Sequence, residues 1–209
     1  SFQFGATLDM LLFMRVLGLH SKALRTAAEN ARTERDAMHS LAHTDPLTGL
    51  PNRRGMSLAL TAALSQCCHE RMLAVYVLDL DGFKPVNDEH GHDVGDELLV
   101  AVARRLQGHV RATDLVARLG GDEFVVVAGA LESAAQAQDL AQKLLNAFRA
   151  PFSLSAGQIH VGLTIGFALA PLDCNDAAGL LKLADAAMYA GKQGGKFRVQ
   201  RNTERLAMP

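Results

Sequence analysis

The chain has 209 residues and is 49% hydrophobic, so it can bury one substantial core with an extension, and its composition does not indicate disorder. Its 21 Lys and Arg against 22 Asp and Glu leave a net charge of -1, which disfavours nucleic acid as a partner because no overall basic field is present. Three cysteines are too few for a disulfide scaffold and indicate a reducing, cytoplasmic compartment.

The first apolar segment, residues 4–20, is interrupted by Asp9 and Arg15. A membrane-spanning helix needs about 20 mostly apolar residues, so this segment does not span a bilayer by itself. It fits the cytoplasmic end of a last membrane helix, because Arg15 and the basic residues after it would lie on the inner side. Residues 1–19 are therefore predicted to be the end of a membrane helix in a longer protein.

Residues 20–43 contain no proline or glycine and are rich in Ala, Arg, Glu and Leu, which favours one continuous helix. Seam residues recur every seven positions, as in a parallel coiled coil, and they are Met10, Leu17, Leu24, Ala31 and Met38. We expect a signalling helix or coiled-coil stalk over residues 1–43. The seam is weak, since Glu34 or Arg35 falls in or beside it, so an amphipathic helix docked on its own domain remains the alternative.

Proline and glycine return together at residues 44–55, which breaks the helix and predicts a globular domain over residues 44–203 with a tail at 204–209. The expected elements are a helix at 52–69, a strand at 72–80, a helix at 94–110, a hairpin at 115–129, a helix at 131–148, a strand at 158–170, a helix at 178–193 and a closing strand at 196–199. Strands alternate with helices but include a hairpin, so the fold is predicted to be α+β, with a mixed sheet of the ferredoxin-like kind.

Acidic residues are expected at one edge of this sheet. Residues 73–78 of the strand at 72–80 are apolar without a break, which is typical of a central strand, and Asp79 and Asp81 emerge at its carboxyl end. Ligands bind at such ends of open sheets. In the hairpin, Gly120 and Gly121 can adopt the positive φ of a tight turn and would let a large anion approach the backbone.

The hairpin turn also carries Asp122 and Glu123. If the hairpin lies beside the strand that ends at Asp79, three carboxylates meet at one edge, and a hard divalent cation would relieve their repulsion. Mg²⁺ commonly binds through one or two carboxylates plus substrate phosphates, so the pattern predicts a metal-bound phosphate site. A solvated hairpin tip is the alternative.

Further polar residues follow the first acids. Lys84 can neutralise a phosphate, and Asn87 and Asp96 can pair with the edge of a base. Asp accepts from the N1 and N2 donors that guanine presents and adenine lacks, so this set favours guanine. His90 and His92 lie in what reads as a glycine-containing loop without the spacing of a closed zinc site, so zinc is disfavoured.

Five segments in order across residues 45–196 resemble the GGDEF family of bacterial diguanylate cyclases: "DPLTGLPNR", "DLDGFKPVNDEHGHDVGD", "RATDLVARLGGDEF", "TIGFA" and "LLKLADAAMYAGKQGGK". The resemblance implies a fold like the palm of adenylyl cyclases and an enzyme that joins two GTP into cyclic di-GMP with release of two pyrophosphates. It also implies Mg²⁺ or Mn²⁺ as cofactor. A linear dinucleotide must be closed by two attacks and each domain has a single GTP site, so a homodimer is expected. The apolar N-terminal segment predicts a cytoplasmic domain of a protein at the bacterial inner membrane.

The same resemblance implies roles for individual residues. The metal would be held by Asp79, the Leu80 carbonyl, Asp122 and Glu123. The catalytic residues would be Lys84, Asp122 and Glu123. The residues at the GTP site would be Asn87, His92, Asp96, Gly120, Gly121, Lys192 and Lys196. Activation of the attacking 3′-hydroxyl by Asp122 as a base and activation by the metal both remain open.

The chain departs from the family pattern near its end. Lys196 and Phe197 stand where the family usually has Arg-Asn, and Gly191 replaces a usual alanine. Lys192 and Lys196 can still meet phosphates, although Lys cannot make the bidentate contact of Arg.

Arg111 and Asp114 have the spacing of the family's product-inhibition motif, which implies a binding site for cyclic di-GMP. A surface ion pair is the other interpretation of these two residues. For the whole domain, the alternative function is a catalytically inactive module that binds cyclic di-GMP. The presence of Asp79, Asp122 and Glu123 disfavours that alternative, and Asp96 disfavours a cyclase that makes a mixed adenine-guanine dinucleotide.

Overall fold

The computed structural model describes residues 42–201 of the chain. The predicted membrane segment and stalk, apart from their last residues, and the tail at 204–209 lie outside the described residues. The chain divides into two compact units, and the described elements belong to the unit that begins at His43. The helices are α2 Arg53–Leu64, α3 Phe83–His90, α4 His92–Gln107, α5 Ala134–Ala147 and α6 Ala177–Gln193. The strands are β1 Met72–Asp81, β2 Leu115–Gly120, β3 Glu123–Leu131, β4 Phe152–Leu154, β5 Gly157–Ile159, β6 Gly162–Ala170 and β7 Val199–Arg201.

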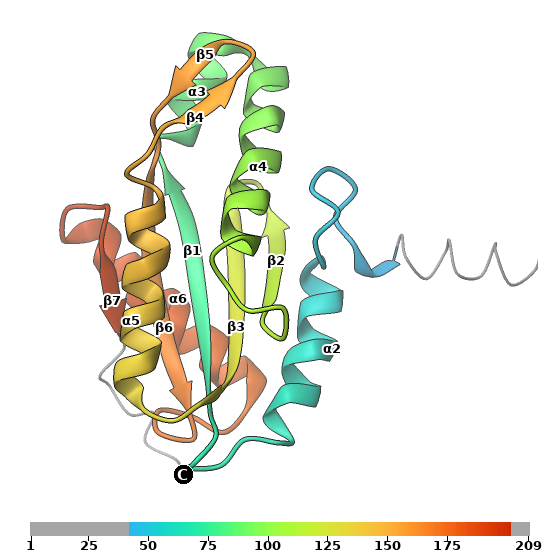
Figure 1. Ribbon diagram of the computed structural model, residues 1–209, viewed down its shortest axis with the longest axis vertical. Coiled ribbons are helices and arrows are strands. Elements are labelled where there is room, and N and C mark those ends of the chain that lie inside the picture. Colours follow the sequence, from blue (N-terminus) through green and yellow to red (C-terminus); the bar gives the residue numbers. More distant parts are fainter. Residues whose placement is uncertain (1–41, 202–209) are drawn as a thin grey trace, which may run out of the picture. The chain divides into compact units, whose positions relative to one another are not determined.

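Five strands form one mixed sheet in the order β2-β3-β1-β6-β7, and β4 and β5 form a separate small hairpin. β1 pairs antiparallel with both β3 and β6, β2 pairs antiparallel with β3, and β6 pairs parallel with β7. Figure 1 shows β1 in the middle of this sheet with helices on both faces. The α+β architecture expected from the sequence is therefore confirmed.

Both faces of β1 are buried. Tyr76 and Leu78 belong to the core cluster that includes residues of α4 and α5, whereas Val75 and Val77 belong to the cluster that includes residues of α2 and α6. A strand covered on both sides has no need for polar residues at alternate positions, which explains its unbroken apolar run. This burial fixes the position of the carboxyl end of β1, which lies between β3 and β6.

The structure corrects the prediction of a loop before residue 94. The segment expected to be a loop forms α3, and α4 begins at His92, two residues earlier than predicted. Gly91, with φ 85°, ends α3 and separates it from α4. Pro85 is tolerated because it lies in the first turn of α3. His90 and His92 therefore lie at a helix end and a helix start, and the interpretation of this segment as a loop was wrong.

The structure also corrects several boundaries. The strand predicted at 158–170 is two strands, β5 and β6, and β4 was missed. The helices predicted at 52–69 and 131–148 are shorter, and the second begins after Ser133, whose side chain accepts a hydrogen bond from the backbone N–H of Gln136. The closing strand begins at Val199 because Lys196 and Phe197 adopt left-handed φ values of 57° and 45°. In the described part of the chain, no helix is long and apolar enough to cross a membrane.

Candidate active site at the carboxyl end of the central strand

The hairpin of β2 and β3 lies beside β1, as the predicted site requires. Asp79 of β1 is directly opposite Glu123 of β3, and on its other side it is opposite Thr164 of β6. Gly120 and Gly121 have φ values of 140° and 54°, which residues with a Cβ rarely adopt. A Cβ at either glycine would meet no atom within 4 Å, so the backbone conformation, and not a lack of space, requires glycine at this turn.

Asp79 is the most deeply buried of these acids, with only 6% of its surface exposed. Burial is the main cause that raises its pKa, and the negative charges of Asp122 and Asp81 raise it further. The ammonium of Lys192, from α6, lies 2.5 Å from Asp79 Oδ1 and acts in the opposite direction. The fold thus places a carboxylate where its charge is unfavourable and a cation is needed beside it.

The residues predicted to hold the metal have donor atoms that suit a hard divalent cation. Carboxylate oxygens of Asp79, Asp122 and Glu123 and the carbonyl of Leu80 are the ligand type that Mg²⁺ and Mn²⁺ prefer. Within residues 42–201, no three His, Cys, Asp or Glu side chains are gathered closely enough to hold a metal by themselves. Mg²⁺ commonly takes only one or two carboxylates and completes its shell with water and substrate phosphates, so such a site does not need three.

The residues predicted to bind the guanine base, and the catalytic candidate Lys84, lie on α3 and the first turns of α4. Lys84 and Asn87 lie on α3, and His92 and Asp96 lie on α4. The helices meet closely at Gly95, where an added Cβ would lie 1.8 Å from Asn87 Oδ1. Gly95 therefore makes the space that the Asn87 amide occupies.

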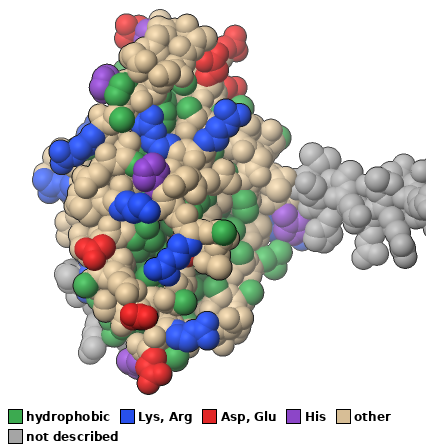
Figure 2. Space-filling model, in the orientation of Figure 1, with side chains coloured by type: hydrophobic (Ala, Val, Ile, Leu, Met, Phe, Trp, Pro, Cys, Tyr) green, Lys and Arg blue, Asp and Glu red, His purple; other side chains and the backbone are tan. Residues whose placement is uncertain are grey.

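A pocket of about 490 Å³ lies along the outer side of α4. Asp96 lines it together with Leu47 and with Leu154 of β4, whereas Asn87 does not. Figure 2 shows acidic side chains at the end of the molecule where α3 and the start of α4 lie. A triphosphate that approaches this end would need cations to offset those carboxylates.

The departures near Lys196 have a local explanation. A Cβ added to Gly191 would lie 3.1 Å from the Thr164 methyl carbon Cγ2, and one added to Gly162 would lie 3.3 Å from the Phe197 ring. Contacts of 3.0–3.4 Å are tighter than most Cβ contacts, so both neighbours would have to move. The two glycines thus leave room for the threonine methyl and for the phenylalanine that replaces the usual asparagine.

One long-range contact beside the acidic turn was missed by sequence reasoning. Arg118 Nη1 donates to both carboxylate oxygens of Asp45 at 3.0 Å, and its Nε and Nη2 donate to the Gly121 carbonyl at 3.0 and 2.8 Å. Arg118 thereby ties the 44–51 loop to the glycine turn that carries the acids. Burial acts to raise the pKa of Asp45, but hydrogen bonds from Thr48 and Arg118 and the positive charge of Arg118 lower it overall.

Arg111 and Asp114 lie in the loop before β2, away from the acids. The Arg111 backbone N–H donates to Asp114 Oδ2 at 2.9 Å, and the salt bridges of the described residues include none between these two side chains. Both residues line a pocket of about 340 Å³ that also includes Lys143 and Asp139 of α5. The Arg111 guanidinium is thus available to a ligand, and the surface ion pair considered as the alternative is not formed.

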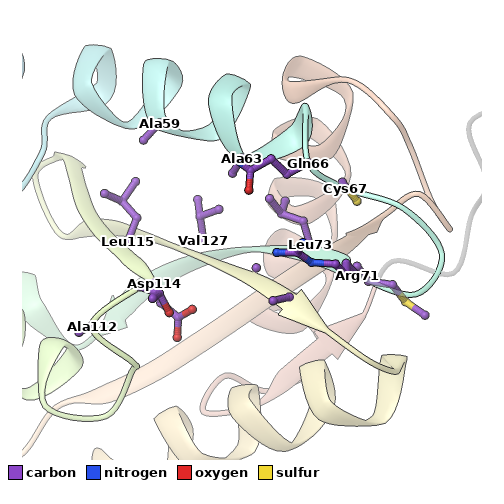
Figure 3. A pocket seen from close by; sticks show the side chains of 14 residues that line it. Ala59, Ala63, Gln66, Cys67, Arg71, Leu73, Ala112, Asp114, Leu115 and Val127 are labelled. Carbon is purple, nitrogen blue, oxygen red and sulfur yellow. The ribbon is translucent and has the colours of Figure 1, made fainter.

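A larger pocket, of about 510 Å³, lies between α2 and the beginning of β1 and β2. Figure 3 shows Leu73, Leu115 and Val127 pointing from the sheet toward α2, with Arg71 beside them. Asp114 lines this pocket too, but none of the acids at the carboxyl end of β1 does. This larger pocket therefore lies apart from the predicted metal and phosphate site.

Comparison with known proteins identifies the family. Residues 42–198 match the family described as diguanylate cyclase, GGDEF domain. The chain is 41% identical over 194 residues to the bifunctional diguanylate cyclase/cyclic di-GMP phosphodiesterase MucR of Pseudomonas aeruginosa, which covers 91% of this chain and 28% of MucR. It is 42% identical over 191 residues to the diguanylate cyclase TpbB of the same species, with 90% and 42% covered. The chain thus spans less than half the length of these two relatives.

Solved structures agree. A structure comprising only the GGDEF domain of TpbB has a TM-score of 0.74 and 42% identity, over 77% of this chain and 94% of that one. The coiled coil and GGDEF domain of DgcB from Caulobacter crescentus, in complex with cyclic di-GMP, has a TM-score of 0.73 and 27% identity, over 88% and 98%. With its acidic turn placed beside the central strand, the chain belongs to the GGDEF domain family.

Proposed function

We propose that this chain is a diguanylate cyclase domain that condenses two GTP into cyclic di-GMP. The observation that carries the proposal is the pairing of Asp79 with Glu123, which brings the buried strand end and the glycine turn to one edge. An inactive domain that only binds the dinucleotide would not need this edge. The presence of Asp79, Asp122 and Glu123 favours the enzyme over that alternative.

The reaction consists of two nucleotidyl transfers. The 3′-hydroxyl oxygen of one GTP bonds to the α-phosphorus of the other, the bond from that phosphorus to pyrophosphate breaks, and the hydroxyl proton passes to a base. In a second transfer, the remaining 3′-hydroxyl attacks the remaining α-phosphorus and releases the second pyrophosphate, which closes the ring. Two GTP thus give one cyclic di-GMP and two pyrophosphates. A bound Mg²⁺ or Mn²⁺ would offset the charge of the phosphates and lower the pKa of the attacking hydroxyl.

The residues of the chain bind and orient the substrate. Asn87 and Asp96 would hydrogen-bond the guanine edge beside His92, and the open turn at Gly120 and Gly121 would let the phosphates approach the backbone. Lys84, Lys192 and Lys196 would stabilise phosphate charge. Lys192 would exchange its partner Asp79 for phosphate oxygens when the nucleotide and the cation enter. Asp122 lies at the same edge and is the candidate base for the hydroxyl proton.

Each domain offers one GTP site, so two domains must face each other across the substrates, and we propose a homodimer. A stalk over residues 1–43 would raise the effective concentration of one domain near the other. The pocket with Arg111 and Asp114 would bind the product and inhibit the enzyme. In the full-length protein, this domain would be cytoplasmic and anchored at the inner membrane.

The test is an assay of the purified chain with GTP and Mg²⁺, with the nucleotide products resolved by chromatography. We expect cyclic di-GMP and pyrophosphate in a ratio of one to two, and no product when ATP replaces GTP. Binding of cyclic di-GMP without any turnover of GTP, at protein concentrations where the chain is dimeric, would instead favour the inactive module.

A further inference from the structure

Asp81 and Asp79 lie two residues apart on β1 but have different partners. Asp79 pairs with Lys192 at the acidic edge. Asp81 Oδ2 instead accepts hydrogen bonds from Thr164 Oγ1 at 2.7 Å and from the backbone N–H of Phe197 at 2.9 Å. The Asp81 carboxylate is thus bound to the loop that follows α6, and not to the glycine turn.

That loop, residues 194–198, has an unfavourable backbone. Lys196 and Phe197 both have φ values in the left-handed region, where a residue with a Cβ is disfavoured. Such conformations persist only where the surrounding structure enforces them, and they are frequent at functional sites. Within the loop, the Lys196 N–H reaches the Gly191 carbonyl at 3.3 Å, and the Phe197 N–H reaches Asp81. The bond to Asp81 is therefore a side-chain restraint on the segment that carries Lys196, beside the backbone bond from the Ile165 N–H to the Arg198 carbonyl at 2.9 Å.

Thr164 completes this arrangement. It is fully buried on β6 opposite Asp79, its hydroxyl donates to Asp81, and its methyl faces Gly191 of α6. The second oxygen of Asp81, Oδ1, is buried and has no hydrogen-bond partner. An unsatisfied buried carboxylate oxygen lowers stability, so this carboxylate is a poor choice for stability alone.

We propose that Asp81, with Thr164, is a positioning residue that fixes the 194–198 loop and so directs Lys196 toward the phosphates at the acidic edge. The inference rests on the proposed function and extends it to a residue outside the predicted site. Asp81 acts through Lys196 on the β- and γ-phosphates, which leave as pyrophosphate, and it does not act on the guanine base. Its loss should therefore weaken the binding of the triphosphate and of pyrophosphate, while guanine selectivity is kept.

The experiment measures three quantities: KM for GTP, the inhibition constant of pyrophosphate in the presence of Mg²⁺, and the ratio of kcat/KM for GTP and ITP. Asp81→Ala is expected to raise KM and the pyrophosphate constant together by at least about tenfold, because it removes charge-assisted hydrogen bonds. Thr164→Val, which keeps the shape but loses the hydroxyl, should raise both by about threefold. The GTP to ITP ratio should stay unchanged in both variants.

Further variants separate positioning from other roles. Asp81→Asn retains an oxygen that can accept from Phe197 and should stay within about threefold of the wild type, whereas a metal ligand would lose as much with Asn as with Ala. Combined with Lys196→Ala, Asp81→Ala should raise the pyrophosphate constant no further than Lys196→Ala alone, since both changes remove the same contact. Asp185→Ala, at an exposed position of α6, is the control and should leave all three quantities unchanged.

An unchanged pyrophosphate constant in Asp81→Ala and Thr164→Val would overturn the inference, as would Asp81→Asn being as impaired as Asp81→Ala. If Asp81→Ala does not fold, Thr164→Val and Asp81→Asn still decide the question. A wild-type chain that makes no cyclic di-GMP would contradict the proposed function itself. An active wild type with unaffected variants would contradict only the role of Asp81.

Discussion

Two carboxylates in this domain, Asp45 and Asp79, are held in opposite ways. Asp45 accepts from Arg118 and Thr48, and these contacts lower its pKa despite partial burial. Asp79 is buried, lies near two other acids, and has a raised pKa even with Lys192 beside it. The first carboxylate is satisfied by the protein alone. The second is left with a charge that a bound cation would stabilise, which fits the proposed metal site.

The largest expected effect is at the acidic turn. Asp122→Asn should lower turnover of GTP by at least about 100-fold, because a group that transfers a proton or stabilises charge is lost. The fold should be kept, since the backbone conformation of the turn depends on its glycines. Steady-state kinetics and circular dichroism on the same preparation check both statements, and turnover near the wild-type value would remove Asp122 from the mechanism.

The next effect concerns product binding, far from this edge. Arg111→Ala should raise the inhibition constant of cyclic di-GMP about 10- to 150-fold, as expected for the loss of one charge-assisted contact, while the initial rate at low product stays nearly unchanged. Inhibition is measured by adding cyclic di-GMP to the GTP assay. Arg149→Ala, at an exposed position outside the pocket, is the control. An equal inhibition constant in wild type and Arg111→Ala would withdraw the feedback site.

A smaller effect is expected from the ion pair of Arg118 with Asp45. Arg118→Met should lower the free energy of unfolding by about 2 kcal/mol, below the value for a fully buried pair because both side chains keep some solvent contact. Activity should also fall, since the Gly121 carbonyl loses its donors and the turn loosens. Urea unfolding gives the stability, with Arg53→Met as an exposed control. Unchanged stability and activity would show that this contact does not restrain the turn.

The features of this domain that the sequence predicts are those that depend on residues close together in the chain. Asp79 and the glycine turn were placed correctly because an apolar run and a Gly-Gly pair are local patterns. α3 was missed because its segment is short and polar and contains Pro85, and β4 was missed because it has only three residues. The contact of Arg118 with Asp45 joins residues 73 positions apart, and no local pattern connects them. The hydrogen bonds of Asp81 to β6 and to the last loop were not predicted for the same reason.

The smallest expected effect is the pH dependence of the stability that Asp45 contributes. The folded pKa of Asp45 lies below its usual value near 3.8, so its stabilisation is present above that value and is lost as the pH falls through the folded pKa. The stability difference between wild type and Asp45→Asn should therefore be constant near neutral pH and shrink below about pH 3.8. Unfolding free energies measured from pH 7 to pH 3 check this. A difference independent of pH would mean that the charge of Asp45 contributes nothing.

The most direct test of the central claim, that the buried charge of Asp79 is kept for a cation and not for stability, is a paired measurement on Asp79→Asn. Turnover of GTP and the midpoint of thermal unfolding are recorded for wild type and variant, with and without Mg²⁺. Because the charged form of Asp79 is disfavoured by burial, we expect a midpoint equal to or above that of the wild type, a turnover at least about 100-fold lower, and no response to Mg²⁺. A variant that turns over GTP at the wild-type rate, or that loses stability along with activity, would contradict this account.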